Sequence, residues 1–145
     1  MSICSECGAN DCQDSCYELS AYTLSLHDDF FIHQVVVDAY AASHNESFHK
    51  PIRTAFALMG QYLLLERNYS GKEVQQAHMK LAKQTKDWPR FVTPSGRILF
   101  SVADVLLVPD EQKAEKIMEW AQSVWQFWKP EHENIQKLVQ TYLEV

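Results

Sequence analysis

Helix-breaking residues are scarce in this chain. Its 145 residues include 4 glycines and 5 prolines, which argues against a loop-rich fold and against long disordered tails. No stretch comes near the roughly 18 uncharged apolar residues of a membrane-spanning helix, and we therefore expect no membrane partner. The length suits one domain, so we interpret residues 1–145 as a single domain.

Positive charge is also scarce. The chain has 13 Lys and Arg residues against 19 Asp and Glu residues, a formal net charge of −6. Binding to nucleic acid requires a basic face that neutralises phosphates, so we expect no nucleic-acid partner. The first residues lack the basic and apolar regions of a secretory signal, which predicts a cytoplasmic location. In such a reducing compartment, clustered cysteines indicate metal or redox chemistry instead of disulfides.

Cysteine is absent after residue 16, and all four cysteines lie between residues 4 and 16. The segment from Cys4 to Gly8 has the C-x2-C-G form of a metal knuckle, in which two thiolates face one ion across a tight turn. A redox C-x-x-C motif normally begins a helix that follows a strand, and residues 1–3 are too short for that strand. We therefore predict that Cys4 and Cys7 bind zinc, and that residues 1–16 form a metal-knuckle loop.

The remainder of the chain, residues 17–145, shows helical periodicity. We predict an all-α bundle of about six helices. Residues 30–44 contain three consecutive valines that favour a strand, but about fifteen residues without Gly or Pro are too long for a typical strand and indicate a helix. Residues 51–67 are apolar almost all round, which indicates a buried central helix. Ser70 and Glu73 match a capping box that begins a helix running to about Lys86.

Helix geometry predicts where further metal ligands lie. Cys16 is expected at the start of the first helix, which forms an antiparallel hairpin with the helix at 30–44. At 1.5 Å per residue, His44 lies about 16 Å from His33, so His44 is beside Cys16 and His33 is near the hairpin turn. We predict Cys16 and His44 as the third and fourth ligands. Alternatively, one of the predicted ligands is replaced by Cys12, His33 or His49.

Polar residues recur on one face of the helix expected at 30–44. Residues three and four apart share a helix face, and the residues on this face are His33, Val37, Tyr40 and His44. Such a face is polar enough to line a cleft, or else His33 and Tyr40 are hydrogen-bonded core residues. In an enzyme, both would be candidate acid–base groups.

Asp38 lies off this face and is the third candidate catalytic residue. It could pair with a cation on a neighbouring helix, such as Arg53 or Arg67. It could also orient a metal-bound histidine through a hydrogen bond. Structural pairing is the more common use of such a carboxylate.

Several short motifs occur in a fixed order along the chain. They are CSECGA followed by Cys16-Tyr17, the pattern H-x4-D-A-Y-x3-H from His33 to His44, LLLER, SVADVL and WAQSVWQFW. Together they resemble domain-of-unknown-function family 5946, a family of uncharacterised bacterial proteins. The resemblance spans nearly the whole chain, and it implies an all-α fold without implying an activity.

The resemblance also bears on the ligands. The residues that match the family pattern are Cys4, Cys7, Cys16, His33, Asp38, Tyr40 and His44. Cys12 does not match, which favours a zinc site made of Cys4, Cys7, Cys16 and a histidine. The segment between Cys7 and Cys16 is shorter than in typical members.

Three functions follow as hypotheses. In the first, a closed structural zinc site stabilises a small helical protein that binds a small molecule or another protein, and a homodimer belongs to this hypothesis. In the second, zinc with an open position activates water in a hydrolase or transferase, with His33, Asp38 and Tyr40 as candidate catalytic residues. In the third, the cysteines perform thiol redox chemistry. No P-loop, HExxH or Ser-His-Asp order indicates a particular reaction.

Overall fold

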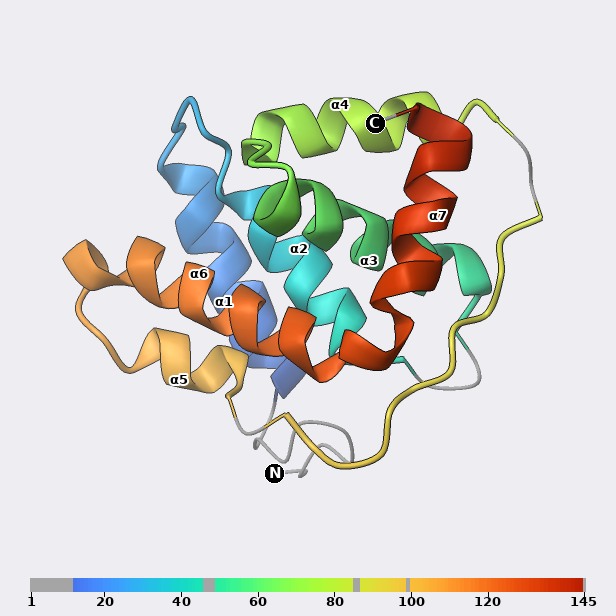
Figure 1. Ribbon diagram of the computed structural model, residues 1–145. Coiled ribbons are helices and arrows are strands. Elements are labelled where there is room, and N and C mark those ends of the chain that lie inside the picture. Colours follow the sequence, from blue (N-terminus) through green and yellow to red (C-terminus); the bar gives the residue numbers. More distant parts are fainter. Residues whose placement is uncertain (1–11, 46–48, 85–86, 99, 145) are drawn as a thin grey trace.

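The computed structural model describes residues 12–45, 49–84, 87–98 and 100–144. Within these ranges the chain forms seven α-helices and one short 3-10 turn and contains no strand, which confirms the all-α prediction (Figure 1). The predicted metal knuckle at residues 4–8 lies outside the described residues and stays a prediction. The helices are α1 (Cys12–Ser25), α2 (His33–Ala42), α3 (Pro51–Glu66), α4 (Gly71–Leu81), α5 (Val102–Leu106), α6 (Asp110–Phe127) and α7 (His132–Leu143), with η1 (Lys129–Glu131) between the last two.

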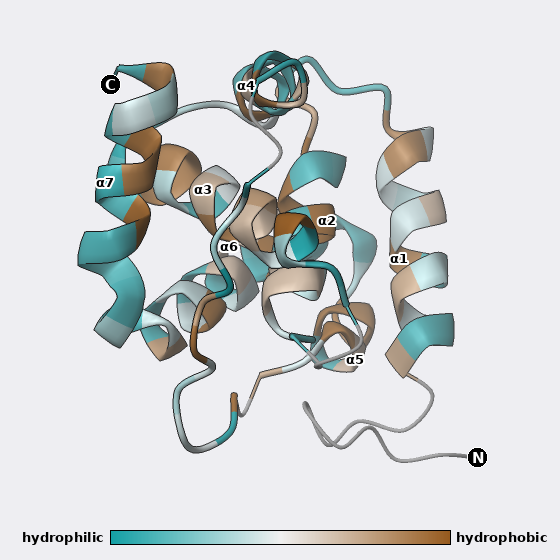
Figure 2. Ribbon diagram, turned by 90° about the vertical axis from the view of Figure 1, so that its right-hand side faces the viewer, coloured by the Kyte–Doolittle hydropathy of each residue, from teal (hydrophilic) through white to brown (hydrophobic). Residues whose placement is uncertain are grey.

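Helices α2 and α3 form the centre of the molecule (Figure 1). Every residue of α3 from Ala57 to Leu64 is buried, as the uniformly apolar sequence predicted. Val35 and Val36 of α2 are buried as well, because α2 packs against both α3 and α6. Burial on several sides explains why a valine-rich segment forms a helix despite its strand propensity. Figure 2 shows the hydrophobic residues of α7 turned toward α3, which closes the core on that side.

Tryptophans connect α6 to the ends of the central helices. Trp125 donates from Nε1 to Glu66 Oε2 at 2.8 Å, at the end of α3. Trp128, directly after α6, donates from Nε1 to the Ala42 carbonyl at 2.8 Å, at the end of α2. Both rings are fully buried, so each fixes a helix end while filling the core.

Helices α1 and α2 form the predicted antiparallel hairpin. Thr23 near the end of α1 lies beside His33 at the start of α2, and Cys12 at the start of α1 lies beside His44 after the end of α2. Helix α1 packs on α2 and α5 and runs along one edge of the molecule (Figure 2). None of the helices in the described ranges is long and apolar enough to span a membrane.

Two helix boundaries differ from the sequence prediction. Helix α1 begins at Cys12 instead of Cys16, because the polar segment before Cys16 forms a helical turn with Asp14 in its first turn. Helix α4 ends at Leu81, well before Lys86. The capping box of Ser70 and Glu73 is confirmed, since each side chain bonds the backbone N–H of the other residue.

Candidate functional site

Cys12 and His44 lie side by side at the end of the α1–α2 hairpin that is opposite its turn. Cys12 Sγ lies 3.5 Å from His44 Nε2 and 3.6 Å from the hydroxyl oxygen of Tyr40. The Tyr40 ring also stacks on the His44 ring, with the ring centroids 4.1 Å apart. The start of α1 therefore faces an imidazole and a phenol presented by the last turn of α2.

The hydrogen bonds of His44 indicate which ring nitrogen carries the proton and which one has a free lone pair. His44 Nδ1 lies 2.8 Å from the Tyr40 carbonyl oxygen and 2.8 Å from Ser43 Oγ. A carbonyl oxygen can only accept a hydrogen bond, so we assign the ring proton to Nδ1. Nε2 of the neutral ring is then unprotonated and faces Cys12 Sγ. Histidines that bind metals have this arrangement, with the far nitrogen donating to a carbonyl.

The end of α2 is held from two sides. Arg53 of α3 donates from Nη1 to the His44 carbonyl at 2.7 Å and to the Ala41 carbonyl at 3.3 Å, and Trp128 bonds the carbonyl between them. These donors satisfy the carbonyls that a helix leaves unpaired at its C-terminus. His44 is buried, and the position of its ring is therefore set by α3 and α6 as well as by α2.

Cys16 lies one turn after Cys12 on the same face of α1. Burial raises the pKa of its thiol, and a hydrogen bond with Ser20 opposes that shift. A raised pKa lowers the fraction of reactive thiolate at Cys16. No three His, Cys, Asp or Glu side chains within the described residues are grouped closely enough to hold a metal. Cys4 and Cys7 lie outside those residues.

His33 and His49 are placed as follows. His33 lies at the closed end of the hairpin, where its Nδ1 is 3.0 Å from Thr23 Oγ1, and burial lowers the pKa of its ring. It is therefore one helix length from His44, as the geometric prediction required. His49 follows His44 in the chain, and its carbonyl accepts a 3.0 Å hydrogen bond from Arg90.

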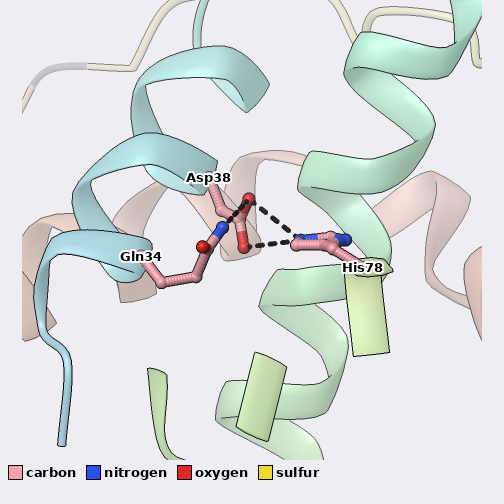
Figure 3. A network of polar contacts seen from close by, with 3 residues as sticks. All are labelled: Gln34, Asp38 and His78. Carbon is pink, nitrogen blue, oxygen red and sulfur yellow. Dashed lines mark hydrogen bonds and ion pairs between the residues drawn. The ribbon is translucent and has the colours of Figure 1, made fainter. Parts of the chain in front are cut away.

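Asp38 pairs with a histidine that the sequence analysis missed. Arg53 and Arg67, which the sequence offered as examples of a partner, do not pair with Asp38. Asp38 instead projects toward α4, where His78 Nε2 lies 3.2 Å from both carboxylate oxygens. Gln34 donates to Asp38 Oδ1 at 3.2 Å from one turn earlier on α2 (Figure 3). The one available signal was the position of His78 beside the apolar stripe of α4, four residues after Val74.

A glycine of α3 makes room for this pair. A Cβ atom at Gly60 would lie 2.0 Å from Asp38 Oδ2 and 2.8 Å from His78 Nε2. Real Cβ atoms do not approach other atoms so closely, so α3 must carry glycine where the carboxylate and imidazole cross it. Asp38, Gly60 and His78 thus form one unit built from three helices.

Burial dominates the electrostatics of this unit. Loss of hydration raises the pKa of Asp38, while the nearby His78 and the hydrogen bonds from His78 and Gln34 oppose the shift. His78 Nδ1 is buried and has no hydrogen-bond partner among the described residues. Phe56 stacks flat on the His78 ring, with the centroids 5.2 Å apart and the planes at 5°.

A groove lies between Cys16 of α1 and the Asp38–His78 pair. It has a volume of about 450 Å³ and lies between α1 on one side and α3 and α4 on the other, with α2 between them. Residues that line it include Cys16 and Ser20 of α1, Val37 and Tyr40 of α2, Phe56 of α3 and His78 of α4. Of the three candidate catalytic residues, Asp38 and Tyr40 line this groove and His33 does not.

Comparison with known proteins gives one match. The model of a family of unknown function, DUF5946, matches residues 2–129. Neither the search of curated proteins nor the search of solved structures gave a match. Because the matched residues make up most of the chain, and because the sequence motifs lie within them, the chain belongs to the DUF5946 family.

Proposed function

We propose that this member of the family is a zinc-stabilised helical protein that acts as a binding module. In this proposal His44, one cysteine of α1, Cys4 and Cys7 coordinate the ion. The observation that carries it is the contact between Cys12 and His44, in which the thiol sulfur and the imidazole Nε2 lie 3.5 Å apart.

The separation of these two atoms suits a shared metal ion. Zinc binds cysteine sulfur at about 2.3 Å and histidine nitrogen at about 2.0–2.1 Å in tetrahedral geometry, which puts the two ligand atoms roughly 3.5 Å apart. Cys12 Sγ and His44 Nε2 have this separation. The hydrogen bond from Nδ1 to the Tyr40 carbonyl would support the ligand from behind.

The cysteine of α1 is the open choice in this ligand set. Helix geometry in the sequence predicted Cys16 at this position, whereas the contact with His44 favours Cys12. Cys7 precedes Cys12 by five residues, a length of chain that reaches at most about 17 Å. Cys4 and Cys7 are therefore close enough to α1 along the chain to share an ion with Cys12 or with Cys16.

A site with four protein ligands would be closed, and closed zinc sites have structural roles. The ion would join the N-terminal segment to both helices of the hairpin. This leaves binding of a ligand or partner as the proposed role of the helical body. A homodimer and a cytoplasmic location stay predictions.

Metal analysis of purified variants tests the proposal. We expect about one zinc ion per chain in the wild type, as structural sites bind near-stoichiometrically. Cys12→Ser and His44→Ala should lose most of the zinc, whereas Cys16→Ser should retain it. His27→Asn is the control, because His27 is exposed and has a positive φ that Asn tolerates. Loss of zinc from Cys16→Ser with retention in Cys12→Ser would assign the position to Cys16, and a metal-free wild type would reject the proposal.

A metal-dependent hydrolase or transferase is the second candidate. It is favoured by the groove, since Tyr40 lines the groove and also contacts Cys12. An enzyme needs an open position on the ion, so a cobalt-substituted protein should change its visible spectrum when an anion such as azide is added. An unchanged spectrum would leave the closed structural site as the better description.

A further inference from the structure

We propose that the groove between α1 and the α3–α4 pair binds a small organic amine with a compact apolar body. The ammonium group would lie toward Asp38, and the apolar body would lie along Val37 and Phe56. This inference rests on the geometry of the groove and of the Asp38–His78 pair, and it is independent of the zinc proposal.

The size and lining of the groove suit a small molecule. Its volume of about 450 Å³ falls within the range of about 300–1,000 Å³ typical of ligand sites. Apolar contributions come from Val37, Ala41, Phe56 and Ala57. Val37 is 42 % exposed at the centre of α2, although α2 is otherwise a core helix. A few polar groups within apolar walls are typical of sites that orient an organic ligand.

Asp38 supplies the negative charge. Its carboxylate accepts from His78 Nε2 and from Gln34, so both neighbours act as donors (Figure 3). His78 Nδ1 is buried without a hydrogen-bond partner among the described residues, so the polar contacts of this imidazole are those with Asp38. Among the described residues no lysine or arginine bonds the carboxylate.

The positive charge of Arg53, which also lines the groove, is directed elsewhere. Its Nη1 bonds the Ala41 and His44 carbonyls, at the negative end of the α2 dipole. Asp38 is the one carboxylate among the described residues that line the groove, so an anionic ligand would be repelled beside it. An amine would form a charge-assisted hydrogen bond there that a neutral ligand cannot form.

The lining also favours a cation over other ligands with a hydrogen-bond donor. Phe56 and Tyr40 both line the groove, and aromatic faces attract ammonium groups. A buried carboxylate with a specific partner in a cleft is also a common mark of a functional site. An ammonium group would place a full positive charge beside this pair.

The binding experiment uses three probes of similar shape and different charge: 2-phenylethylamine, 2-phenylethanol and 3-phenylpropanoate. Each is titrated into the isotopically labelled full-length chain near neutral pH and followed by amide chemical shifts. A matched pair of variants locates the site. Val37→Trp fills the groove, and Val92→Trp adds the same side chain at an exposed valine outside it.

We expect the amine to bind with a dissociation constant of about 1 mM or tighter, reasonable for a ligand of this size. The alcohol should bind about tenfold more weakly because it forms no charge-assisted hydrogen bond, and the propanoate should bind more weakly still. Val37→Trp should reduce amine affinity at least about tenfold, since the added ring occupies the site, and Val92→Trp should not. Asp38→Asn should abolish the preference for the amine over the alcohol.

Three outcomes would overturn the proposal. They are equal or tighter binding of the propanoate, equal amine affinity of Val37→Trp and Val92→Trp, and the absence of saturable shifts. If Asp38→Asn does not fold, the comparison of the three probes on wild-type protein still decides the charge preference. Zinc content measured on the same samples separates this result from the metal proposal.

Discussion

At the scale of single residues, Asp38, Gly60 and His78 depend on one another. Asp38 and His78 come from helices that would otherwise be separated by α3, and the missing side chain of Gly60 lets them meet. Burying a carboxylate is unfavourable unless it is paired and hydrogen-bonded. The pair therefore tolerates little change at any of the three positions.

Gly60→Ala tests this dependence. Glycine within a helix usually lowers the stability of the folded protein by roughly 0.5–1 kcal/mol relative to alanine. The substitution would therefore ordinarily stabilise α3. Here the new Cβ would collide with Asp38 and His78, and overpacking typically costs about 1–3 kcal/mol. We expect urea unfolding to show a lower free energy of unfolding for Gly60→Ala. In an Asp38→Ala background the same change should be much less destabilising, and a stabilised single variant would contradict the collision.

Asp38→Asn tests whether the pKa of Asp38 is raised, through the pH dependence of the free energy of unfolding. Burial raises the folded-state pKa of Asp38 above the usual value of 3.8, so the folded protein retains the Asp38 proton over a pH range in which the unfolded chain has lost it. Folding then becomes less favourable as pH rises from 3.8 toward the folded-state pKa. Asn does not titrate. The free energy of unfolding of the wild type relative to Asp38→Asn should therefore be lower at about pH 7.5 than at about pH 4.5, and a difference that is constant or rises with pH would exclude a raised pKa.

At the scale of helices, the end of α2 is the element that positions His44. Its last carbonyls accept from Arg53 of α3 and Trp128 after α6, so two other helices determine where the imidazole lies. Arg53 of α3 and Trp128 after α6, which are distant in sequence, thus act on the same site. The predicted zinc site is for this reason sensitive to substitutions in the core.

Trp128→Phe tests this coupling, with Trp120→Phe as its matched control. Both rings are almost completely buried, but only Trp128 donates to a carbonyl, whereas Trp120 Nε1 has no partner among the described residues. Trp128→Phe leaves the Ala42 carbonyl without its donor, which costs about 1–3 kcal/mol beyond the loss of ring volume. We expect Trp128→Phe to lower the thermal stability more than Trp120→Phe does, and to bind zinc more weakly. Equal effects of the two variants would show that the hydrogen bond contributes little.

At this scale the sequence predicted the main features of the fold. Apolar residues at helical spacing predicted the buried α3, the capping box predicted the start of α4, and helix length predicted which histidine lies at each end of the hairpin. Cys12 was expected in a loop because its neighbours are polar, although they continue α1. His78 was missed because its partner depends on how α2 and α4 pack across Gly60, and no local pattern contains that information.

At the scale of the whole molecule, the candidate zinc site lies at the edge of the hydrophobic core. The core is formed by fully buried residues of α2, α3 and α6 together with α7, including Leu58, Leu63, Trp125 and Ile135. Cys12 is only partly buried at the edge of that core. A chain of this length buries roughly 68–70 % of its unfolded surface and does not require a metal to form a core.

Zinc should therefore add to the stability of the protein without being required for its helices. A metal that binds the folded chain alone raises the free energy of unfolding by about 1.4 kcal/mol for each tenfold increase in free zinc above the dissociation constant. We expect a strong chelator to lower the urea midpoint while circular dichroism retains the helical signal in water. In buffers of fixed free zinc, the free energy of unfolding should increase with the logarithm of the zinc concentration for the wild type and for His27→Asn. For His44→Ala it should not change with zinc. A wild-type stability that is independent of free zinc would rule out a site formed only in the folded state, and collapse of the helices on chelation would show that the core depends on the metal after all.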